Sequence, residues 1–216
     1  MTDYLTTLAG PPPRGDAARA FYGRVAALTG LPLDVVAKSN GCLRDEYLKS
    51  RRAAEGEVLS IYDATVAAPD PFPDSSRRRG ADPVLEGFSR ALGSAFVGYA
   101  REALGFRTDI TYSLLAGEVN SKWDWPGGRN NASVSDDLRE LLSLTPSFRL
   151  FITHGYSDLV IPYAVSRYVV EHLPQADEPE RVVAKFYRGG HMFYFREDSR
   201  LAAYEDAKVF YNRRAQ

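Results

Sequence analysis

An aspartate and a histidine in the C-terminal third of the chain have the residue types that acid–base chemistry requires. Asp158 lies in the turn after an apolar run, 149–154, and His191 lies in a Gly-Gly turn after a second apolar run, 181–187. A carboxylate beside an imidazole fixes its tautomer and stabilises the imidazolium that forms when the histidine takes a proton from a nucleophile. The alternative is a helix-capping aspartate and an unrelated loop histidine, and the spacing alone leaves both interpretations open.

Two short apolar runs and the segment between them must position these side chains. Both runs are rich in β-branched and aromatic residues and end near glycine, which is typical of buried strands. The segment between them has apolar side chains at helical spacing: Val165, Tyr168, Val169 and Leu173. Together they predict one βαβ crossover of a parallel sheet. Polar groups gather at the carboxyl edge of such a sheet, so we expect the Asp158 carboxylate and His191 Nδ1 to lie roughly 2.6–3.2 Å apart.

The motifs around these residues are similar to those of a known enzyme family. Gly155-Tyr-Ser-Asp-Leu-Val-Ile-Pro162, together with Gly190-His-Met192, resembles the C-terminal part of serine carboxypeptidases, particularly their bacterial members. Weaker matches extend the likeness over nearly the whole chain: 3–8, 104–106, Tyr112 and 123–125. An aspartate followed by a histidine, each after a late strand, also matches the second half of the order Ser, Asp, His in α/β-hydrolases.

The resemblance implies an α/β fold that is the C-terminal portion of an α/β-hydrolase. Residues 1–146 would form a mostly helical cap, and residues 147–216 would form the last βαβα unit of an incomplete parallel sheet. It also implies the release of C-terminal residues from peptides, with Asp158 and His191 as two members of a Ser-Asp-His triad. Met192 would line the pocket for the terminal residue of the substrate. The family is exported, in the periplasm or secreted.

The nucleophile and oxyanion-hole motifs of that family do not occur in this sequence. Neither Gly-Glu-Ser-Tyr-Gly nor Trp-Asn-Gly-Gly-Pro-Gly is present. The nearest imitation is 155–159, but Leu159 stands where the strained elbow needs a second glycine, and Ser157 adjoins Asp158. We therefore expect a fragment whose nucleophile lies in a missing N-terminal half, and no hydrolysis by the chain alone. The alternative is a non-catalytic binding or assembly module that needs a partner chain.

Composition and residue spacing bear on whether nucleic acid, a membrane, a metal or a cofactor should be expected as a partner. With 216 residues, 44% of them hydrophobic, the chain can build a core, and its net charge of −1 gives no electrostatic reason to expect nucleic acid or membrane as a partner. The single cysteine, Cys42, excludes an internal disulfide. The three histidines have no i, i+4 pairing and there is no phosphate loop, so we expect neither a metal nor a cofactor. His154, at a strand end, is expected to be hydrogen-bonded. No signal peptide is recognisable, which leaves localisation open.

The remaining elements follow from local patterns. Capping residues predict the start of three helices: Asp16, Asp82, and Ser133 or Ser135. Two further helices are expected to begin at Pro32 and at about Leu43. A strand is expected at 57–62 and a loop at 67–80, in which the basic run 77–79 is solvated. Trp123 and Trp125 are expected to anchor a loop, or alternatively to stack on substrate. Two strands cut from a larger sheet leave unpaired edges, which predicts self-association.

Overall fold

The computed structural model describes residues 2–125, 127–128, 132–174 and 179–212. The chain forms two compact units, of which the first ends at Pro83 and the second begins at Val84. The predicted cap, 1–146, therefore contains the whole first unit and the beginning of the second. No helix of the described residues is both long enough and apolar enough to span a membrane.

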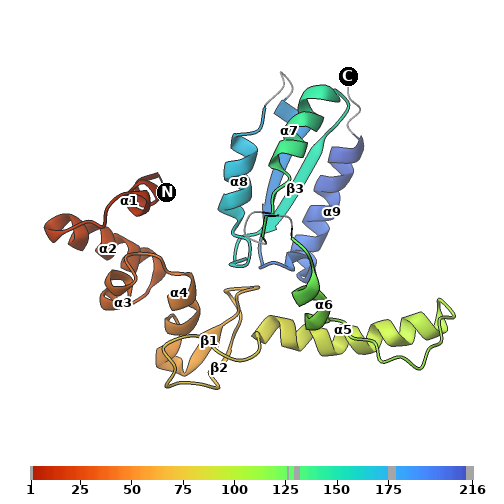
Figure 1. The fold of residues 1–216 in the computed structure, drawn as a ribbon, viewed down its shortest axis with the longest axis horizontal. Helices are drawn as coiled ribbons and strands as arrows, with labels where there is room; N and C mark the ends of the chain where they lie inside the picture. The colour runs from red at the N-terminus through yellow and green to blue at the C-terminus, as the bar shows by residue number, and fades with distance from the viewer. Residues whose placement is uncertain (1, 126, 129–131, 175–178, 213–216) are drawn as a thin grey trace. The chain divides into compact units, whose positions relative to one another are not determined.

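The first unit is a small helical body with a short hairpin (Figure 1). Its elements are α1 (Thr2–Ala9), α2 (Gly15–Thr29), α3 (Leu33–Lys38), α4 (Arg44–Ser50), the 3-10 helix η1 (Ala53–Glu55), β1 (Glu57–Leu59) and β2 (Ala67–Pro69). Phe21, Tyr22 and Val25 of α2 share their core with Leu31 and Val36. Val25 lies four residues after Phe21 and three after Tyr22, which places the three side chains on one face of α2.

The hairpin differs from the prediction. The expected strand 57–62 ends at Leu59, and 67–69, expected as loop, pairs antiparallel with it. Local Pro and Ala favour a loop, but the ladder to β1 overrides that preference. The N-cap of α2 is Arg14, two residues before the expected Asp16, and Asp16 pairs with Arg19 inside the helix.

A buried polar cluster closes the first unit. The Ser60 hydroxyl, fully buried, donates to Asp82 Oδ1 at 2.6 Å, and Arg78 Nη2 lies 3.1 Å from Asp82 Oδ2. Arg78 Nε also donates to the carbonyl oxygen of Leu59 at 3.1 Å. The prediction that the whole basic run is solvated is therefore wrong for Arg78, because its charge is matched by a carboxylate brought close by the fold.

The second unit combines a two-stranded sheet with helices (Figure 1). Its elements are α5 (Pro83–Glu102), which begins at the boundary, α6 (Gly117–Lys122), α7 (Ser135–Leu144), β3 (Leu150–Gly155), α8 (Tyr163–Glu171), η3 (Pro179–Arg181), β4 (Val182–Tyr187), η4 (Phe193–Phe195) and α9 (Glu197–Asn212). Strands β3 and β4 are parallel, with a register that runs from Leu150 opposite Val182 to Gly155 opposite Tyr187. The predicted βαβ crossover is confirmed, and the described fold is mixed α/β.

The flanking helices α8 and α9 lie on opposite faces of this sheet. Phe151 stacks on Phe210 of α9, with ring centroids 5.1 Å apart, and Lys185 forms an ion pair with Asp206 of α9. Phe186, whose side chain points to the other face, packs against Tyr163 of α8 at 5.2 Å. Most strand residues are nevertheless only half-buried, because two strands cannot cover the faces of two helices completely. The strands are therefore less buried than their apolar runs alone predict.

Arg181 fixes how the chain enters the sheet. Its buried guanidinium donates to the carbonyl oxygens of Leu142 at 3.0 Å and Thr145 at 2.8 Å, at the C-terminal end of α7, and to that of Phe148 at 3.1 Å. The last carbonyls of a helix have no partner within it, and a cation also complements the helix dipole. The Arg181 side chain, just before β4, thus holds the end of α7 and the segment that leads into β3 in place by hydrogen bonds.

Candidate active site

Backbone contacts continue past the ends of β3 and β4 and bring the two following turns together. The amide of Tyr156 donates to the carbonyl oxygen of Tyr187 at 2.9 Å, and the amide of Ser157 donates to that of Gly189 at 3.0 Å. The Ser199 hydroxyl of α9 holds the same turn through the Arg188 carbonyl oxygen at 2.7 Å. The turn that carries Asp158 is therefore joined to the turn that carries His191.

Two glycines make this junction sterically feasible. A Cβ at Gly155 would lie 2.7 Å from the carbonyl carbon of Gly190 and closer still to carbonyl oxygens of the same turn. Gly189 has a φ of 116°, a conformation that other residues rarely adopt, and a Cβ there would approach Phe193 and Arg196. The sequence pattern singled out these glycines only as strand ends.

The Asp158 carboxylate is buried and fully engaged. Its residue is 3% exposed, and Oδ1 accepts hydrogen bonds from the amides of Val160 at 2.8 Å and Ile161 at 3.1 Å. Oδ2 lies 2.8 Å from Nδ1 of His191. The predicted distance is confirmed. The helix-capping alternative is wrong, because Pro162 is the N-cap of α8 and Asp158 instead closes its own turn while it contacts the histidine.

His191 is the accessible partner of this pair. Its side chain is 39% exposed, in contrast to the buried carboxylate. A carboxylate oxygen facing Nδ1 favours the tautomer in which Nδ1 carries the proton, so that Nε2 is the nitrogen able to accept one. The arrangement is suited to a general base that later acts as a general acid, with Asp158 stabilising the intermediate imidazolium.

The residues after His191 are held by an aromatic anchor. Met192, half-buried, precedes η4, and Phe193 is buried with its ring stacked on Tyr187 at 5.0 Å. The Tyr187 hydroxyl donates to Asp206 Oδ2 at 2.9 Å, and burial together with that carboxylate raises the pKa of Tyr187. Met192 is thus placed beside His191 by a fixed turn, but its role toward a substrate stays a prediction.

A second histidine lies in the electrostatic neighbourhood of the pair. His154 Nε2 lies 2.7 Å from the Ser166 hydroxyl of α8, which confirms the expected hydrogen bond. Burial lowers the pKa of His154; the charge of Asp158 acts in the opposite direction and that of His191 in the same direction. His154 is therefore neutral near pH 7, and its electrostatic interactions with Asp158 and His191 couple it to the candidate site.

Other predicted features lie elsewhere in the structure. Trp123 is 63% exposed, so it does not anchor a loop as expected; its ring centroid lies 6.3 Å from that of Trp125. Cys42 is a free, exposed thiol, where a partly buried one is the usual finding. Among the described residues, no three His, Cys, Asp or Glu side chains gather in a way that could hold a metal ion.

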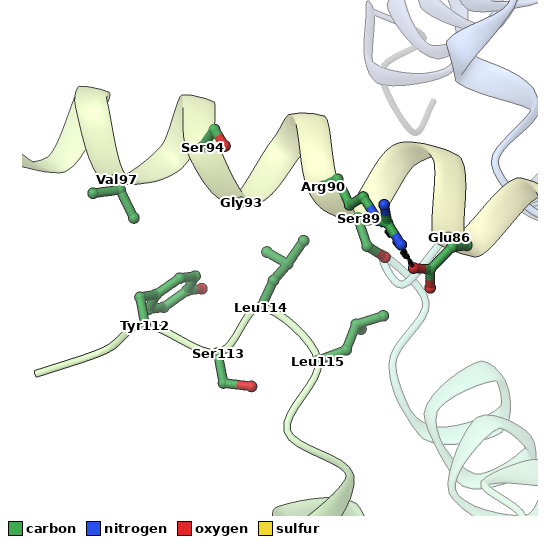
Figure 2. Close-up of a pocket in the computed structure, with 10 residues that line it drawn as sticks. All are labelled: Glu86, Ser89, Arg90, Gly93, Ser94, Val97, Tyr112, Ser113, Leu114 and Leu115. Atoms are coloured by element: carbon green, nitrogen blue, oxygen red, sulfur yellow. Dashed lines mark hydrogen bonds and ion pairs between the residues drawn. The ribbon is translucent and has the colours of Figure 1, made fainter. Parts of the chain in front are cut away.

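A shallow groove in the second unit has a volume of about 690 Å³ (Figure 2). It lies between α5 and the extended segment 112–115, and Figure 2 shows the side chains of Tyr112 and Leu114 directed toward the helix. An ion pair between Arg90 and Glu86 lies at one end. Neither Asp158 nor His191 lines it, so the groove is not part of the candidate site.

Comparisons with protein-family models, with curated proteins and with solved structures found no match to this chain.

Proposed function

We propose that this chain is the C-terminal part of a serine-type carboxypeptidase of α/β-hydrolase fold and supplies the acid–base half of its triad. The observation that carries the proposal is the 2.8 Å contact between a buried carboxylate, Asp158, and Nδ1 of an accessible imidazole, His191, at the carboxyl edge of a parallel sheet. Catalytic groups of open α/β sheets gather at this edge. The resemblance of the two motifs to serine carboxypeptidases names the reaction.

In this proposal the nucleophile is a serine of the missing N-terminal half. His191 Nε2 takes the hydroxyl proton as the serine oxygen attacks the peptide carbonyl carbon, and then donates that proton to the leaving amine. The C-terminal residue departs as a free amino acid and an acyl-enzyme remains. Water, deprotonated by His191, then attacks the acyl group, and the serine regains its proton. Asp158 holds the tautomer throughout, and Met192 lines the pocket of the leaving residue.

The test uses the chain alone and together with the N-terminal half encoded upstream of it. The chain alone should show no labelling by a fluorophosphonate probe in intact mass, because it lacks the nucleophile elbow and the oxyanion donors. With the other half supplied, labelling and release of C-terminal residues should appear. Both should be lost in His191→Gln, whereas His172→Gln, a change at the C-cap of α8, should retain them. Stoichiometric labelling of the isolated chain at Ser157 would overturn the proposal, as would full activity of the His191 variant.

A second candidate is a non-catalytic assembly module that requires a partner chain. It is favoured by the apolar side chains that the flanking helices expose, Val165 and Tyr168 on α8 and Leu201 and Tyr204 on α9. Exposed apolar surface of this kind usually marks an interface. If the parent chain, with His191 intact, binds a partner chain and no hydrolysis accompanies the binding, the assembly function is the correct one.

A further inference from the structure

The long helix α5 leaves an apolar face uncovered. Its large apolar side chains recur at intervals of four, four and three residues and therefore lie on one side of the helix: Phe88, Leu92, Phe96 and Tyr99. Their exposed fractions range from 39% to 57%. Helix α5 makes no extensive contact with any other helix or strand that the structure describes in the second unit. Contiguous apolar surface of this kind usually marks a site of association.

Neighbouring segments cover only the edges of this face. Phe88 contacts the ring of Phe195 and Phe96 contacts the ring of Tyr112, with centroids 4.3 and 4.6 Å apart, yet both phenylalanines stay partly exposed. The groove of Figure 2 lies on another side of α5, which Ser94 lines. The groove and its walls therefore do not cover the apolar face.

The chain exposes more surface than two compact units of its size need. Its accessible surface is 15369 Å². Two separate compact proteins of the sizes of the two units would together expose about 12,000 Å². The difference, about 3,400 Å², exceeds the roughly 800 Å² that each partner buries in a standard stable complex. Helix α5, with 20 residues, is about 30 Å long and offers an uninterrupted site for such a contact.

The apolar face of α5 is complementary to a second copy of itself that runs antiparallel. The spacing of its side chains is nearly the same in both directions. Two helices that cross near Ser94 therefore place Phe88 of each copy beside Tyr99 of the other. Leu92 of each copy then lies near Phe96 of the other. A contact of this kind uses the same surface on both chains and closes after two copies.

The charges of α5 agree with this arrangement. No charged residue occurs at 91–100, the part of the helix that meets at the crossing. One acidic and one basic side chain lie toward each end, Glu86 with Arg90 and Arg101 with Glu102. An antiparallel copy brings Glu86 of one chain near Arg101 of the other, whereas a parallel copy would place like charges side by side. We infer that α5 forms the interface of a symmetric, antiparallel homodimer of this chain.

The first test is disulfide crosslinking of the full chain in a Cys42→Ser background, because Cys42 is its single, exposed cysteine. Ala95→Cys introduces a thiol at an exposed position beside the apolar face and close to the crossing. Ser94→Cys is the matched control, because Ser94 lies on the groove side of the helix. A disulfide requires Cα atoms within about 7 Å of each other. Under mild oxidation we therefore expect intact mass to show a covalent dimer for Ala95→Cys and little for Ser94→Cys.

The second test measures molar mass by light scattering after size-exclusion chromatography over a range of concentrations. Leu92→Lys places a charge at the centre of the face and should weaken dimerisation at least about thirtyfold, as for other central interface residues. Leu144→Lys, which changes an exposed leucine of α7, should leave dimerisation unchanged. Oligomers that form through other surfaces would persist in Leu92→Lys, so an unchanged mass distribution in that variant overturns the inference.

Two further results would also overturn it. One is equal crosslinking of Ala95→Cys and Ser94→Cys. The other is the absence of a covalent dimer together with protection of Ala95→Cys from a thiol reagent when the N-terminal half is supplied, which would assign the face to that half. The inference is independent of the proposed function, because neither Asp158 nor His191 takes part in the contact.

Discussion

Gly155 and Gly190 approach each other so closely that no side chain fits between them. A Cβ on Gly155 would lie 2.7 Å from the Gly190 carbonyl carbon, closer than Cβ atoms come to other groups in proteins. This approach allows the turn after β3 to cross the turn after β4, and it is at this crossing that Asp158 reaches His191. The geometry of the candidate site thus depends on a residue with no side chain.

Replacing Gly155 with alanine should push the two turns apart. We expect unfolding free energy to fall by about 1–3 kcal/mol, as for other overpacked sites, and the hydrogen-bonded Nδ1 proton of His191 to disappear from the NMR spectrum. Urea unfolding measures the first effect. Gly87→Ala is the matched control, because Gly87 is helical and has open space around its Cβ position. That change should be neutral or stabilise by about 0.5–1 kcal/mol. Equal effects at both positions would show that the close approach is unimportant.

Asp158→Asn should change which nitrogen of His191 carries the proton. The amide keeps an oxygen for the turn amides of Val160 and Ile161 but presents an NH₂ group to the imidazole, which then has to accept. We expect the ring ¹⁵N shifts to report a proton on Nδ1 in the parent chain and on Nε2 in the variant. Unfolding free energy should fall by about 1–3 kcal/mol, since the residue is buried. Asp45→Asn, an exposed control, should change neither. An unchanged tautomer would contradict the assigned role of Asp158.

The crossover that carries the candidate site could be predicted because its signals are local. Apolar runs gave β3 and β4 to within about a residue at each end, and helical spacing gave α8. The position of Asp158 and His191 relative to each other then followed from a general property of parallel sheets. No long-range information was needed for either step.

The features that were missed depend on groups far apart in sequence. Arg78 was expected to be solvated, yet it donates to the carbonyl oxygen of Leu59, and Arg181 carried no local sign that it would be buried under the end of α7. The ladder between β1 and β2 forms only when the two arms of the hairpin meet, and the exposure of Trp123 depends on which segments the fold brings near it. Composition describes the average environment of a residue type and contains no information on such partners.

Arg181→Met should weaken the junction between α7 and the sheet. The change removes the Arg181 donor from the carbonyl oxygens of Leu142, Thr145 and Phe148, of which Thr145 keeps the Phe148 amide as a donor. We expect the free energy of unfolding in urea to fall by about 2–4 kcal/mol. Arg167→Met removes an exposed ion pair with Glu171 on α8 and should cost less than about 0.5 kcal/mol. A small effect at Arg181 would mean that water replaces its hydrogen bonds.

The lowered pKa of His154 should make the chain less stable in mild acid. In the unfolded chain His154 takes up a proton near its ordinary pKa of 6.5, whereas in the folded chain burial delays that uptake to lower pH. The contribution of neutral His154 to the free energy of unfolding is therefore fully present above pH 6.5. It is lost as the pH falls from there through the pKa of His154 in the folded chain. His154→Gln, which can still bond the Ser166 hydroxyl, should flatten this decline between pH 7.5 and about pH 5. The shifted carboxylates, Asp70, Asp198 and Asp206, have lowered pKa values and titrate below that range. Parallel profiles for the parent and the variant would refute the assignment.

The two-stranded sheet should make the isolated chain associate with itself. In the part of the chain that the structure describes, β3 and β4 pair only with each other, so each has an outer ladder of backbone groups without a strand partner. Sheets of two strands are marginal in water, and such edges pair readily with other chains. The exposed side chains of Val165 and Tyr168 on α8 add apolar surface beside the sheet. We expect size-exclusion chromatography with light scattering to show oligomers whose fraction rises with concentration. Val165→Lys should reduce that fraction, whereas Leu28→Lys, which changes a still more exposed apolar residue in the first unit, should not. A monomer that melts cooperatively at every concentration would show that these edges are already protected.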